Sequence, residues 1–123
     1  MIRELILVFL GGGMGSVCRY GVGAYLLKSV EVRFPVATLM ANALGCLLIG
    51  LLMGYLSNRP STLWSFLLVT GFCGGFTTFS TFSNETFQLF RQGLYGVALT
   101  YVALSLLLGL LMVALGFLVT KNL

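Results

Sequence analysis

The chain has 123 residues, of which 59% are hydrophobic and only 8% are charged. Soluble domains carry about 25% charged residues, so the composition excludes an ordinary water-soluble protein and indicates a single membrane domain over residues 1–123. The net charge of +4 is scattered along the chain without a basic cluster, which argues against nucleic acid as a partner.

Four apolar stretches follow one another, and each is long enough to cross a bilayer as a helix of roughly 20 residues. They lack the alternation of barrel strands, so we predict an all-α membrane protein with four transmembrane helices. Pro35 and Pro60 each lie just before a stretch, where a helix tolerates proline. The predicted spans are Leu5–Leu27, Val36–Leu56, Leu63–Phe90 and Leu94–Val119.

The start of the first span also has the pattern of a cleaved signal peptide, with Arg3 before a short apolar run. The apolar run continues past Gly15 to Leu27, which favours a retained span. Arg19 lies inside this span, where a charged side chain is expensive and usually functional. It could attract anions from a vestibule or bind carbonyls at a helix end, and the sequence leaves both roles open.

The second and fourth spans each carry a polar stripe. Thr38 and Asn42 lie on one face of the second span by their spacing, and Tyr101 and Ser105 lie on one face of the fourth. These side chains cannot remain unpaired in lipid, so they face protein or water. They could join helices, as small residues such as Gly50 often do, or line a polar path.

The third span contains Gly71, Gly74 and Gly75 followed by a run of threonines and serines. Both residue types weaken a membrane helix, so we predict a break near mid-span. Freed carbonyls at a break can bind a cation, and the next half-helix favours an anion at its N-terminal end. Phe79 and Phe82 share one face of that half-helix, and their ring edges are electropositive.

The residues that carry chemistry in enzymes are nearly absent. The chain has no His and no Asp, and its three cysteines lie far apart in sequence. Metal-ligand spacing and a disulfide framework are therefore missing, and we expect the cysteines to be packing residues. Hydrolytic chemistry is disfavoured, and the protein is not expected to be an enzyme. The cysteines are Cys18, Cys46 and Cys73.

The loops carry balanced positive charge. With four spans, one side of the membrane receives three Lys or Arg residues and the other side also receives three, so the positive-inside rule gives no preference. Such a chain can insert in both directions and pair as an antiparallel dimer, although one fixed topology with a weak signal remains an alternative. The two sets are Arg3, Arg59 and Lys121 against Lys28, Arg33 and Arg91.

Three stretches together resemble the Fluc/CrcB family of bacterial fluoride channels: GGFTTFSTFSNE from Gly74, TLMANALG from Thr38 and GSVCRY from Gly15. The resemblance covers essentially the whole chain. It implies a passive, selective channel in the cytoplasmic (inner) membrane that exports fluoride and protects the cell from it. It also implies a dual-topology antiparallel homodimer with two pores.

The resemblance implies a role for individual residues. Phe79 and Phe82 are the pore phenylalanines, Asn42 is the pore asparagine, and Arg19 is the vestibule arginine. The backbone carbonyls of Gly74 and Thr77 hold a structural Na⁺ at the two-fold axis. The other candidate pore residues are Thr38, Ser80, Thr81, Ser83, Tyr101 and Ser105.

Two features leave questions open. Relatives can carry a further hydroxyl in the fourth span where this chain has Gly109, so the length of the polar track is uncertain. Glu85 is expected to be an edge residue or a structural acceptor, with a coupling carboxylate as the alternative. A small four-helix multidrug antiporter, or a membrane scaffold subunit without transport, are the rival functions. An antiporter typically needs an acid inside its first span, and this chain has none after Glu4.

Overall fold

The fold is described by a computed structural model that covers residues 1–29 and 34–123. Arg33, which contributes to the loop charges, lies outside the described residues. Within the described residues, four helical segments are long and apolar enough to cross a membrane, which confirms the four predicted spans to within a few residues at each end. The segments are Ile2–Leu26, Val36–Asn58, Thr62–Arg91 and Tyr95–Thr120.

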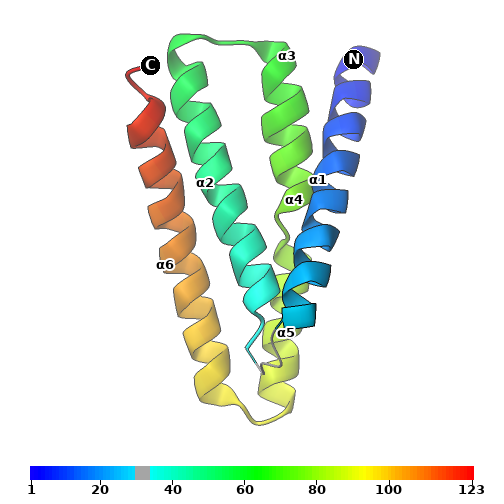
Figure 1. Cartoon of the computed structure of the whole chain (residues 1–123), viewed down its shortest axis with the longest axis vertical. Helices are drawn as coiled ribbons and strands as arrows, with labels where there is room; N and C mark the ends of the chain where they lie inside the picture. Colours follow the sequence, from blue (N-terminus) through cyan, green and yellow to red (C-terminus); the bar gives the residue numbers. More distant parts are fainter. Residues whose placement is uncertain (30–33) are drawn as a thin grey trace.

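The helices run alternately up and down. Helix α1 (Ile2–Ser29) and the third span descend, whereas α2 (Val36–Asn58) and α6 (Tyr95–Thr120) ascend (Figure 1). The two termini and the connection between α2 and α3 therefore lie at one end of the molecule. The α5–α6 turn lies at the other end, where Gly93 adopts a positive φ of 77° that suits a residue without a side chain.

The third span is built from four pieces. It consists of α3 (Thr62–Trp64), a π-helix η1 (Ser65–Cys73), α4 (Gly74–Phe76) and α5 (Phe79–Arg91). The sequence predicts a break near mid-span, and the chain does become extended there, at Thr77 and Thr78. The glycines expected to weaken the helix remain helical, because the break is created by contacts at Thr78. The π-helical stretch was not predicted.

Glycines bring the helices into close contact. On α1, a Cβ at Gly11 or Gly15 would collide with the backbone of η1, and a Cβ at Gly50 of α2 would collide with the backbone of α6. Thr120 of α6 also donates a hydrogen bond to the carbonyl of Leu51 at 2.7 Å. Gly50 therefore allows α2 and α6 to pack closely, as expected for a small residue that joins two helices.

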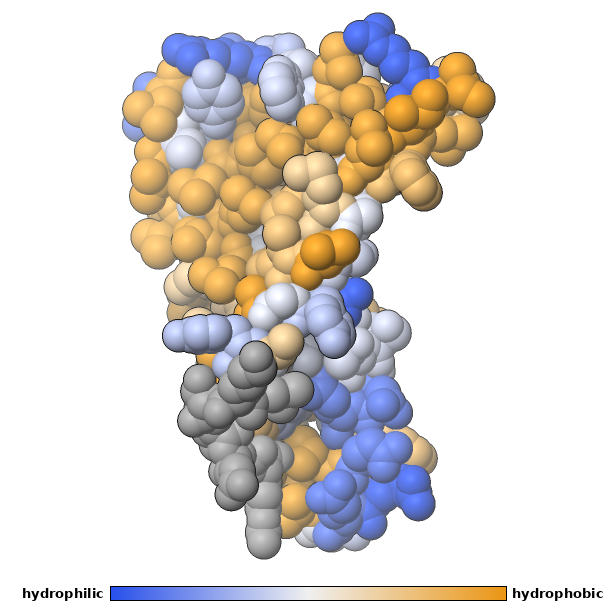
Figure 2. Space-filling model, turned by 45° about the vertical axis from the view of Figure 1, so that its right-hand side comes forward, coloured by the Kyte–Doolittle hydropathy of each residue, from blue (hydrophilic) through white to orange (hydrophobic). Residues whose placement is uncertain are grey.

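Most large apolar side chains lie on the outside. Figure 2 shows an apolar surface over the upper part of the molecule, with hydrophilic residues at the top edge and over the lower end. The buried hydrophobic side chains among the described residues are few: Ala41, Cys73, Phe76, Leu89, Ala98 and Tyr101. Such an exterior suits lipid, or another protein surface within lipid.

Candidate functional site

The break in the third span is held by Asn42 of α2. Its side-chain Nδ2 donates to the carbonyl of Thr78 at 3.0 Å, and its Oδ1 accepts from the Thr78 N–H at 2.8 Å. The Thr78 hydroxyl then accepts from the N–H of Thr81 at 3.2 Å and caps α5. Asn42 thus pairs with the backbone of the break, a role that the sequence did not indicate.

The same contacts leave two backbone carbonyls without their helical hydrogen bonds. In a continuous helix, the N–H of Thr78 would bond to the carbonyl of Gly74, and the N–H of Thr81 to that of Thr77. Both N–H groups have other acceptors here. The carbonyls of Gly74 and Thr77 are therefore relieved of their helical partners, and both residues line one cavity. Oxygen atoms of this kind suit a hard cation such as Na⁺.

We name this space the phenylalanine cavity. It has a volume of about 530 Å³. The residues that line it come from α2, the third span and α6, and they include Asn42, Thr77, Phe79, Phe82 and Ser105. The rings of Phe79 and Phe82 lie 6.0 Å apart, as expected for neighbours on one helix face. With Gly74, six candidate residues predicted from the sequence thus meet in one place.

One hydroxyl in this cavity, that of Ser105, has no hydrogen-bond partner among the described residues. Tyr101 is fully buried and lines neither cavity, and its hydroxyl lies beside Glu85 and Thr38. The Tyr101 ring packs 5.1 Å from that of Phe82. A buried hydroxyl without a partner is unfavourable by about 1–3 kcal/mol, so the Ser105 hydroxyl is suited to meet a ligand that accepts hydrogen bonds.

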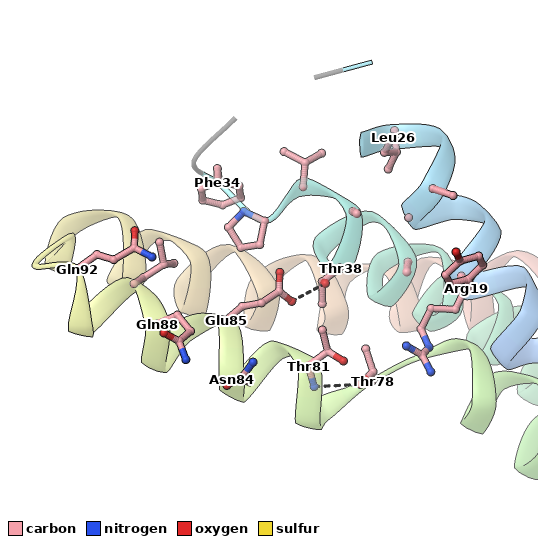
Figure 3. A pocket seen from close by; sticks show the side chains of 18 residues that line it. Arg19, Leu26, Phe34, Thr38, Thr78, Thr81, Asn84, Glu85, Gln88 and Gln92 are labelled. Atoms are coloured by element: carbon pink, nitrogen blue, oxygen red, sulfur yellow. Dashed lines mark hydrogen bonds between the residues drawn. The ribbon is translucent and has the colours of Figure 1, made fainter. Parts of the chain in front are cut away.

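A second space, which we name the polar cavity, lies between α1, α2 and α5 and has a volume of about 570 Å³. Figure 3 shows Arg19, Thr38, Thr81 and Glu85 around it. The Thr38 hydroxyl donates to a carboxylate oxygen of Glu85 at 2.5 Å. Glu85 is therefore half-buried and acts as an acceptor for α2, as expected for a structural acceptor.

Arg19 binds the end of α4. Its Nε donates to the carbonyl of Gly75 at 3.2 Å, and the Ser16 hydroxyl donates to the same carbonyl at 3.4 Å. The helix-end role is therefore present in the structure. The side chain also lines the polar cavity, so it places a positive charge there, and the vestibule role stays a prediction.

The hydroxyls of α5 do not form one group. Thr81 lines the polar cavity, whereas Ser80 is exposed and lies 3.3 Å from the Thr78 hydroxyl. Ser83 is exposed and lines neither cavity. Thr38 belongs with Glu85 in the polar cavity, one helical turn from Asn42. Most candidate residues are therefore divided between two cavities, and Ser80, Ser83 and Tyr101 line neither.

Four further residues emerge from the structure alone. Thr78 holds the break through both its backbone and its hydroxyl. Three amide side chains, two on α5 and one at its C-terminal cap, line the polar cavity in steps of four residues: Asn84, Gln88 and Gln92. The four-residue spacing could have revealed this row in the sequence, whereas the pairing of Thr78 with α2 had no sequence signal.

Within the described residues, no group of three or more His, Cys, Asp or Glu side chains could hold a metal ion. The three cysteines are free: Cys18, Cys46 and Cys73.

Comparison with known proteins covers almost the whole chain. The family model described as CrcB-like protein, Camphor Resistance (CrcB), matches residues 6–117. The chain is 44% identical over 124 residues to the fluoride-specific ion channel FluC of Flavobacterium psychrophilum, with 99% of this chain and 100% of the relative covered. It is 45% identical over 119 residues to FluC of Phocaeicola vulgatus, covering 94% and 96% of the two chains.

Proposed function

The chain belongs to the CrcB-like protein family, and we propose that it is a passive fluoride channel that lets cytoplasmic fluoride leave the bacterial cell. Relatives at 44% and 45% identity are named as fluoride-specific ion channels. With four membrane spans, the protein is a multi-pass protein of the cytoplasmic (inner) membrane. Its activity is transport, without enzymatic chemistry.

The observation that carries this function is the unpartnered hydroxyl of Ser105 in a cavity lined by two phenylalanines. Fluoride is small and strongly hydrated, so a pore must replace its water with close hydrogen-bond donors. Hydroxyls, the Asn42 amide and the positive ring edges of Phe79 and Phe82 are such groups. They carry no permanent positive charge, so they would not trap the ion.

The polar cavity supplies an entrance for the ion. Arg19 places its charge at this cavity, and a positive charge in a cleft raises the local concentration of anions. The Nε contact with Gly75 holds the guanidinium in place. The ion would pass from this entrance along α5 toward the phenylalanine cavity, because the two cavities share Thr78.

The working unit is an antiparallel homodimer with dual topology and two pores. A single chain leaves Phe79 79% exposed and the phenylalanine cavity open at its surface. A second copy would cover this face, and the balanced loop charges permit both orientations. A tag at the C-terminus should then be accessible from both sides of the membrane. Labelling from one side alone would contradict this arrangement.

A structural Na⁺ completes the dimer. The carbonyls of Gly74 and Thr77 from two opposed chains would provide four oxygen ligands near the two-fold axis. Their release from helical hydrogen bonds by Asn42 and Thr78 supports this assignment. Bound Na⁺ would offset the cost of leaving these carbonyls unpaired within the membrane.

Fluoride efflux from liposomes that contain the purified protein tests the function, with a fluoride electrode as the detector and a chloride electrode for the chloride control. We expect rapid efflux once a K⁺ ionophore balances charge, and little efflux when chloride replaces fluoride. A multidrug antiporter would instead show proton-coupled movement of an organic cation, and a scaffold subunit would show no flux. Either result would overturn the proposal.

A further inference from the structure

Two cysteines lie on facing helices at the phenylalanine cavity. Cys46 is on α2 and Cys73 is the last residue of η1, and both line the cavity. Cys46 is half-buried and Cys73 is 2% exposed. Neither residue has a role in the proposed function. Cys18, by contrast, is exposed on α1 and lines neither cavity.

The antiparallel register places both cysteines on the walls of the same cavity. Helix α2 ascends while the third span descends (Figure 1), and the register is set where Asn42 binds Thr78. Cys46 lies one helical turn after Asn42 on α2. Cys73 lies a little more than one turn before Thr78 on the third span.

The wall of the cavity formed by α6 lies close to Cys46. Gly109 of α6 has no side chain, and a Cβ added there would meet the Cys46 sulfur at 3.6 Å, with no other atom within 4 Å. The Cys46 sulfur thus faces α6 next to Ser105, one turn away on the same helix. An ion bound to this sulfur would lie within the cavity.

We propose that Cys46 and Cys73 form a two-thiol site for soft metal ions such as Hg²⁺, and that an ion bound there closes the cavity to fluoride. Soft ions prefer thiolate ligands, and Hg²⁺ commonly takes two in a linear arrangement. With mercuric chloride, two S–H bonds break and two Hg–S bonds form. The two protons leave with the two chloride ions, and no oxidation occurs.

Metal binding can be tested on the purified protein, independently of transport. In a Cys18→Ser background, mercuric chloride is added stepwise and the remaining thiols are counted with a maleimide. We expect both thiols to disappear after one mercury ion per pair. A requirement for one mercury ion per thiol would overturn the proposal.

Single-cysteine variants provide the matched control. Cys46→Ser and Cys73→Ser in the same background each retain one thiol, which should release its mercury readily to a competing monothiol. The Cys46–Cys73 pair should retain its mercury under the same conditions. Equal release from the pair and from the single thiols would overturn the two-thiol site.

The effect on flux rests on the proposed function. Mercuric chloride should remove most fluoride efflux from the wild type and from Cys18→Ser, whereas Cys46→Ser and Cys73→Ser should each keep most of their own flux. Undiminished wild-type flux after mercury binding would overturn the closure. An absence of fluoride flux before mercury is added would instead reject the proposed function and leave the binding result standing.

Discussion

The side-chain amide of Asn42 forms two hydrogen bonds with the backbone of Thr78, across 36 residues of sequence. This pairing replaces the helical hydrogen bonds that Thr78 would otherwise make, and it stabilises the break in the third span. The Nδ2 group has a second N–H, which has no partner among the described residues. One amide can therefore stabilise the break and still donate a hydrogen bond to an anion in the phenylalanine cavity.

Replacing Asn42 should damage both the fold and the flux. In Asn42→Ala, the N–H of Thr78 loses its acceptor, and an unpaired buried group costs about 1–3 kcal/mol. We expect a lower thermal midpoint in detergent and a loss of most fluoride efflux. A variant that keeps the wild-type midpoint would show that the break does not depend on this amide.

Ser105 should affect flux without affecting stability. Its hydroxyl has no hydrogen-bond partner in the part of the chain that the structure describes, so Ser105→Ala should remove no hydrogen bond from the fold, while it removes a donor from the cavity. We expect a marked loss of fluoride efflux at an unchanged thermal midpoint. Thr100→Val is the control on the same helix, because the Thr100 hydroxyl is exposed and bonds to Gly96 of its own helix. Equal flux in the two variants would contradict a pore role for Ser105.

The two phenylalanines should tolerate replacement structurally but not functionally. Apolar swaps of similar volume usually cost less than about 1.5 kcal/mol, and Phe79 is largely exposed in the single chain. Phe79→Ile and Phe82→Ile are therefore expected to fold as dimers and to lose most fluoride efflux, because the electropositive ring edges are gone. Efflux near the wild-type rate in both variants would show that these two residues only contribute to packing.

Gly15 should be intolerant of any side chain. A Cβ at this position would collide with the carbonyl of Phe72 and approach the N–H of Phe76, and overpacking usually costs about 1–3 kcal/mol. We expect Gly15→Ala to lower the thermal midpoint. Gly21→Ala on the same helix is the control, since no other helix among the described residues has an atom within 4 Å of a Cβ there. Similar midpoints for the two variants would mean that the close contact between α1 and the third span does not contribute to stability.

Removal of Na⁺ should weaken the dimer. If the carbonyls of Gly74 and Thr77 hold the ion, replacing Na⁺ by a large organic cation leaves them unpaired within the membrane, which is unfavourable. We expect lower fluoride efflux and a larger monomer fraction by cross-linking, both restored when Na⁺ is returned. Unchanged flux and an unchanged dimer fraction after complete exchange would contradict a structural role for Na⁺.

The sequence by itself determined the solvent and the spans of this protein. Four apolar stretches predict the four membrane helices to within a few residues, because a bilayer requires long apolar segments with internal hydrogen bonds. The spacing of residues also placed Phe79 and Phe82 on one face of their helix, and the family resemblance grouped them with Asn42 and Ser105, which line the same cavity.

Only the tertiary structure decided where the third span breaks and what each polar group does there. The glycines at 71, 74 and 75 stay helical, and the break falls at Thr77 and Thr78, because Asn42 supplies replacement hydrogen bonds from another helix. Likewise, Arg19 binds the end of α4, and Ser83 faces away from both cavities. Local sequence sets what a helix can tolerate, whereas the position of a break depends on partners that lie far away in the chain.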